Sequence, residues 1–179
     1  GASRAAHLTC FRALASECAA RWLDVQRFEQ HNSVDRNKFP QFTNELRAAM
    51  AEEPQRFFLD VVQNDRSILS FLYARHTFVN PILARHYGIP QSQLKSDREN
   101  GWSRIDDATA YQRGGLLPMA AFLTKNAPGL RTSPVKRGYW VVRRILGERI
   151  PPPPPNVPEL PADESKLGEL TLRETLAKH

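Results

Sequence analysis

Histidines are the side chains of this sequence that could ligate a metal or haem iron, or move protons near neutral pH. His76 and His86 lie in two copies of Ala-Arg-His on either side of Asn80-Pro81, and His179 is the last residue. We treat these three histidines as candidate cofactor ligands. The alternative for His76 and His86 is a partly buried imidazole that bonds a helix end. The sequence contains no His-Glu-x-x-His and no Cys-x-x-Cys, so it predicts no metal site.

The segment around Ser133 could bind an anion. Ser133 is expected to cap a helix whose first residue is Pro134, and the free amides at a helix start attract anions. Lys136 and Arg137 would lie in the first turn, with Arg131 just before it. We therefore expect Arg131, Ser133, Lys136 and Arg137 to hold a phosphate, sulfate or carboxylate. The alternative is a network of salt bridges to neighbouring acidic residues.

Complete catalytic motifs are not found in this sequence. The adjacent acids Glu52-Glu53 and Asp106-Asp107 are poor acid–base pairs, because neighbours on a helix do not face each other. We expect Asp106-Asp107 to begin a helix at Ala108 instead. There is no Gly-x-Ser-x-Gly, P-loop or dinucleotide fingerprint. An enzyme of unknown reaction that uses His76 or His86 stays open as an alternative.

Charge is unevenly distributed along the 179 residues, whose formal net charge is +6. Residues 131–149 hold six basic residues and one acidic residue. Such a segment could bind a polyanion or nucleic acid, or form a solvated helix face. A nucleic-acid partner is not expected, since aromatic residues are not interleaved with the basic ones. No run of 18 apolar residues occurs, so the sequence predicts no membrane span.

Helices must position these side chains, because apolar residues recur every three or four positions in most of the chain. Thr43 or Asn44 should cap a helix that Pro54 kinks or splits, and Asn80, Pro81 and Gly88 mark the start and end of another. We expect Gly114-Gly115 to form a tight turn with positive φ. The expected helices cover residues 4–25, 43–61, 67–75 (with Asp65 as the alternative start), 81–87, 116–123, 134–146 and, at the end, 169–179.

The predicted fold class is all-α, because no strand pattern of convincing length appears. The expected architecture is an irregular helical bundle with long loops, among them residues 90–107, and a C-terminal polyproline strap from Pro151 to Pro155. The alternative for the prolines is a ligand for an aromatic groove. We divide the chain into a helical module over residues 1–107 and a second one over residues 108–179.

Four segments of the sequence resemble a known family. FLYARHTFVNPILARHYGIP, RGGLLPMAAFLT, RTSPVKRGYWVVRRILG and PPPPPNVPEL are similar to the paired modules of large planctomycete-type cytochrome c-like proteins, whose function is unknown. The resemblance extends from Trp22 to His179. In that family the segment resembling TLRETLAKH leads into a c-type haem motif, Cys-x-x-Cys-His, which this sequence does not contain.

The resemblance implies a role for the chain. It would be a non-catalytic helical module, without a cofactor of its own, that supports or docks a c-type haem domain or subunit of the same protein. The haem would lie in the adjoining segment and serve electron transfer or oxidative chemistry. An extracytoplasmic location, periplasmic or at the cell surface, is implied as well. By position, His86 and residues 131–137 would be the first residues to test.

Overall fold

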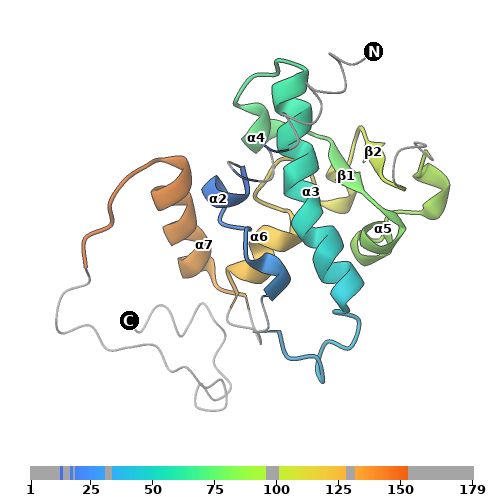
Figure 1. Cartoon of the computed structure of the whole chain (residues 1–179), viewed down its shortest axis with the longest axis horizontal. Helices are drawn as coiled ribbons and strands as arrows, with labels where there is room; N and C mark the ends of the chain where they lie inside the picture. The colour runs from blue at the N-terminus through green and yellow to red at the C-terminus, as the bar shows by residue number, and fades with distance from the viewer. Residues whose placement is uncertain are drawn as a thin grey trace.

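One long helix, α3 (Asn44–Gln63), forms the centre of the fold (Figure 1). The computed structural model describes residues 13, 17, 19–30, 34–95, 101–127 and 132–152. Helix α5 (Pro81–Tyr87) and strand β1 (Thr77–Val79) contact α3 on one side, and α6 (Ala120–Lys125) contacts it on the other. The shorter elements are α2 (Ala20–Trp22), η2 (Phe28–Gln30), α4 (Ser70–Tyr73), η3 (Gln91–Gln93) and η4 (Thr109–Tyr111).

The central helix forms where the apolar spacing predicts it. Thr43 caps it by accepting a hydrogen bond from the Leu46 amide at 3.2 Å, which confirms the predicted start. Pro54 does not split the helix. The Gln55 side chain donates to the carbonyl of Ala51 at 3.1 Å, next to the carbonyl that proline leaves without its usual donor. The buried face is then continuous along the helix and carries Leu46, Met50, Phe57 and Val61.

The all-α prediction is wrong, because a small antiparallel sheet is present. Strand β1 pairs with β2 (Ser103–Ile105), with Thr77 opposite Ile105 and Val79 opposite Ser103. The fold is therefore mixed, mainly helical with a two-stranded sheet. Each strand has only three residues, too few to show alternation in the sequence. Residues 90–107, predicted as a surface loop, contain β2 and the buried Trp102.

Two other helices begin as their capping residues predict. Asn80 accepts a hydrogen bond from the Leu83 amide at 2.8 Å, and α5 ends at Gly88, which has φ 73°. Helix α7 (Pro134–Trp140) begins after Ser133 and continues as the π-helix η5 (Val141–Ile145). Helix α4 starts at Ser70, three residues later than predicted. Most of the expected first helix, the final helix and residues 153–155 of the polyproline strap lie outside the described residues.

Helices α6 and α7 pack into the same core as the elements before them. Trp140 of α7 meets Phe122 of α6 edge to face, with ring centroids 4.7 Å apart. The indole of Trp22 donates to the carbonyl of Arg144 at 2.9 Å, and Lys125 pairs with the Asp24 carboxylate at 2.7 Å. The module boundary at residue 107 stays a prediction, although core residues from both sides of it form one cluster.

Replacing Gly114 tests the turn that brings α6 to the core. Gly114 has φ 123°, and a Cβ atom there would lie 2.5 Å from the backbone oxygen of Ala74. We expect Gly114→Ala to lower the free energy of unfolding by more than about 3 kcal/mol, since strain and a backbone clash act together. Urea denaturation measures this change.

A glycine with positive φ and open surroundings provides the control. Gly88 has φ 73°, and a Cβ atom there would meet nothing within 4 Å. Gly88→Ala should therefore lower the free energy of unfolding only by the cost of a left-handed backbone at a non-glycine residue, about 1–2 kcal/mol. Equal losses in the two variants would show that the close approach of Gly114 to Ala74 has no energetic consequence.

Candidate functional site

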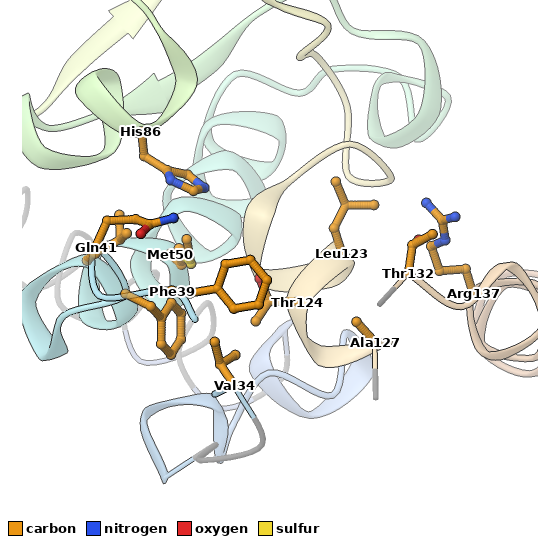
Figure 2. A pocket seen from close by; sticks show the side chains of 12 residues that line it. Val34, Phe39, Gln41, Met50, His86, Leu123, Thr124, Ala127, Thr132 and Arg137 are labelled. Atoms are coloured by element: carbon orange, nitrogen blue, oxygen red, sulfur yellow. The ribbon is translucent and has the colours of Figure 1, made fainter. Parts of the chain in front are cut away.

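A pocket of about 370 Å³ opens between α3, α5, α6 and the start of α7 (Figure 2). Its walls are mostly apolar. Met50 and Leu46 come from the buried face of α3, Leu123 from α6, and Phe39 and Phe42 from the segment that precedes α3. The volume falls in the range of small-molecule sites, about 300–1,000 Å³. Because residues between 34 and 50, His86, and residues between 123 and 137 form these walls together, only the folded chain creates the pocket.

Two of the predicted site residues lie at this pocket. His86, near the end of α5, and Arg137, in α7, both line it, and Figure 2 shows them on opposite sides of the view. His86 is exposed to solvent at the edge of the pocket, and partial loss of water around its ring and, to a smaller extent, the Arg113 guanidinium lower its pKa. The imidazole is therefore neutral at pH 7, with one N–H donor and one acceptor nitrogen. Arg137 is then the permanent cation among the described lining residues.

His76 does not lie at a binding site. Its side chain is buried between α3 and the sheet, where Nε2 is 2.9 Å from Oδ2 of Asp60 and the ring stacks on Phe57. Burial is the main cause that lowers the pKa of His76, and the Arg104 guanidinium adds to it. Asp60 also accepts hydrogen bonds from Arg66 at 2.8 Å and from Arg104 at 3.1 Å. This corresponds to the structural alternative for His76.

The predicted anion-binding group can be followed only in part. Ser133 Oγ accepts a hydrogen bond from the Lys136 amide at 3.3 Å, which confirms the cap. Lys136 is exposed, whereas Arg137 lies at the pocket. Arg131 and His179 are outside the described residues. Anion binding by this group of residues stays a prediction.

One carboxyl group of the pair Glu52-Glu53 is buried, which the sequence did not predict. Glu53 lies on the inner side of α3 with no solvent exposure. Its Oε1 accepts from Thr77 Oγ1 at 2.5 Å, and its Oε2 accepts from the Tyr87 hydroxyl at 2.5 Å. The same hydroxyl accepts from the amide of Ala120 at 2.9 Å. The available signal was helical spacing, because Glu53 shares the apolar face of Met50, three residues before it.

Burial sets the protonation of this cluster. Loss of water raises the pKa of Glu53 to about 7, although the hydrogen bonds from Thr77 and Tyr87 act in the opposite direction. The guanidinium of Arg113 lies 4.2 Å from the centre of the Tyr87 ring, and its buried Nε has no hydrogen-bond partner in the described part of the chain. The pair Asp106-Asp107 differs in its exposure to solvent. The carboxylate of Asp107 lies on the surface and pairs with Arg75 at 2.6 Å.

The described residues offer neither a metal cluster nor a membrane span. Across these ranges, no three His, Cys, Asp or Glu side chains gather in a way that could hold a metal ion. Within the same ranges, no helix has the length and apolar character that crossing a membrane requires.

The fold and pocket define a small, mainly helical module with a ligand-sized pocket, and two family models match it. Residues 4–89 match PSD4, a protein of unknown function (DUF1592), and residues 113–179 match PSCyt3, a protein of unknown function (DUF1588). The chain is therefore similar to the paired planctomycete cytochrome c-like modules of unknown function. A search of curated proteins and a search of solved structures each found no match.

A glutamine in place of Glu53 should remove a pH dependence of stability. Between pH 4.5 and about 7 the folded protein keeps a proton on Glu53 that the unfolded chain releases. This group therefore stabilises the fold most at low pH, and its contribution falls as the pH rises through that window. The difference in unfolding free energy between the wild type and Glu53→Gln should fall by about 3 kcal/mol from pH 4.5 to 7.5.

The neighbouring glutamate gives a matched control. Glu52 is half-exposed on the same helix and pairs with Arg56 at 2.6 Å. Urea denaturation of Glu52→Gln across the same pH range should give a profile parallel to that of the wild type. The lowered pKa values of His76 and His86 affect all three proteins alike and cancel in the comparison. A Glu53→Gln profile parallel to the wild type would contradict the prediction.

Proposed function

We propose that this chain is a non-catalytic helical module that docks against a c-type haem domain of the same protein, or a haem-bearing subunit, in extracytoplasmic electron transfer or oxidative chemistry. The observation that carries the proposal is the outer face of α7 and η5. There, exposed apolar side chains stand among the cations Arg143 and Arg144. The exposed apolar residues are Val135 at 56%, Tyr139 at 49% and Leu146 at 61%.

The arrangement of these side chains suits a haem edge. Nη1 of Arg143 donates to the Tyr139 hydroxyl at 3.2 Å, which holds the cation beside an aromatic ring. Arg144 lies 3.9 Å from Asp24, a loose contact that leaves its guanidinium partly exposed. Together with Trp140 these residues line a polar hollow of about 370 Å³. A haem carries two propionates at one edge of a flat apolar ring, so neighbouring cations and an aromatic surface complement it.

The family matches support a haem-linked role, because both halves of the chain are similar to modules of cytochrome c-like proteins. The state of His76 argues against acid–base catalysis by that residue, since Asp60 and Phe57 enclose it. A sulfated polyanion such as heparin could use the same arginines, but it has no flat apolar group to place against Tyr139 or Leu146. The apolar component of the face therefore favours haem docking over binding of such a polyanion.

Removing the two arginines should weaken haem docking. A suitable probe is the haem-peptide released from a c-type cytochrome by proteolysis, which retains haem on Cys-x-x-Cys-His. We expect the double variant Arg143→Ala, Arg144→Ala to bind it about five- to tenfold more weakly, because two partly exposed charge contacts are lost. Quenching of tryptophan fluorescence measures the affinity.

The control removes the same charge from another side of the protein. Arg85 lies in α5 and Lys95 follows η3, and both are exposed. Figure 1 shows α5 and α7 on opposite sides of α3. The variant Arg85→Ala, Lys95→Ala should retain wild-type affinity. Tyr139→Ala should weaken binding of the haem-peptide while leaving heparin binding unchanged. Equal effects of both double variants, or heparin binding without haem-peptide binding, would sink the proposal.

A further inference from the structure

We propose that the pocket between α3, α5, α6 and α7 is a binding site for a small monocarboxylate with an apolar, aromatic body. The site is distinct from the haem-docking face, because it involves Arg137 and not Arg143 or Arg144.

The pocket is an apolar hollow that is open to solvent. Its volume of about 370 Å³ falls in the range of small-molecule sites, about 300–1,000 Å³. Water inside it would meet few polar groups, since Phe39, Phe42 and Leu123 form much of its wall. An apolar ligand would therefore release poorly bonded water on entry.

The aromatic side chains on the wall favour a flat ligand body. Phe39 and Phe42 enter the pocket from the segment before α3. Figure 2 shows the labelled Phe39 within the pocket, near Thr124 in the view. Phe39 is 36% exposed, an unusual state for a large aromatic side chain that faces a concave apolar surface. Stacking against it would cover that surface, and aromatic pairs gain more than their buried area alone provides.

Charge selects an anion for the polar end of the ligand. The described residues that line the pocket include the cation Arg137 and no Asp or Glu. Among the described residues, the guanidinium of Arg137 makes no ion pair, whereas Arg56, Arg66, Arg75 and Arg104 all do. A carboxylate would satisfy this guanidinium with two parallel hydrogen bonds. A metal cation would find no oxygen-rich carboxylate set here.

The number of cations in the wall limits the ligand to a single negative charge. Arg137 is the one Lys or Arg among the described lining residues, and one carboxylate neutralises it. His86 lines the pocket as well and is exposed to solvent there. The imidazole can still donate one hydrogen bond, and with Gln41 it offers polar contacts at the side away from Arg137 (Figure 2). An ether, carbonyl or hydroxyl oxygen on the ligand body would be accepted there.

The test compares two probes of the same shape. 2-Naphthoate carries the carboxylate, and 2-naphthamide replaces it with a neutral amide. Isothermal titration calorimetry on the full chain should show naphthoate binding about tenfold more tightly than the amide, because the charged hydrogen bonds to Arg137 are lost in the amide. Equal affinity for the two probes, or no binding of either at millimolar concentration, would overturn the proposal.

Two arginines give matched variants. Arg137→Gln should abolish the preference for naphthoate, whereas Arg85→Gln removes the same charge from an exposed position that does not line the pocket and should leave the preference intact. Thr124→Phe should fill the pocket and weaken binding of both probes at least about tenfold. If that variant fails to fold, the pair at residues 85 and 137 still decides the outcome. Haem-peptide binding rests on Arg143 and Arg144, so either proposal can fail without the other.

Discussion

The hydrogen bonds to the buried carboxyl of Glu53 hold together the two sides of this fold. A carboxyl group shut off from water is costly unless its oxygens have partners. Here the hydroxyls of Thr77 and Tyr87 provide them, and this fixes β1 and α5 against α3. The Tyr87 hydroxyl in turn accepts a hydrogen bond from the backbone amide of Ala120 at the start of α6. One polar chain thus links the sheet side of α3 to the helices on its other side.

This chain of hydrogen bonds also crosses between the two regions that match family models. Glu53 and Tyr87 lie in residues 4–89, whereas Ala120 and Arg113 lie in residues 113–179. The packing of Trp140 on Phe122 and the contact of Trp22 with Arg144 extend the same junction to α7. The two regions therefore share one interior, and a partner that binds α7 binds an element fixed to the core.

Two surfaces result from that placement of α7. Its first turn closes the apolar pocket with Arg137, while its outer face, continued by η5, carries Tyr139, Arg143 and Arg144. In the pocket, apolar groups surround one cation, which is the basis of the small ligand that we propose. On the outer face, cations and apolar groups are exposed together, which is the basis of the larger partner that we propose. A seven-residue helix can contribute to both surfaces because each turn presents side chains in several directions.

The sequence by itself determined the features that depend on neighbouring residues. These are the helix caps at Thr43, Asn80 and Ser133, the turn at Gly114-Gly115 and the family resemblance. Only the tertiary structure decided what depends on contacts between distant segments. The three-residue strands acquire their pairing from a partner more than 20 residues away, so the all-α prediction was wrong. His76 and His86 each end a copy of the tripeptide Ala-Arg-His. His76 is hydrogen-bonded to Asp60, whereas His86 lines the pocket. Such differences arise from packing, which no local pattern encodes.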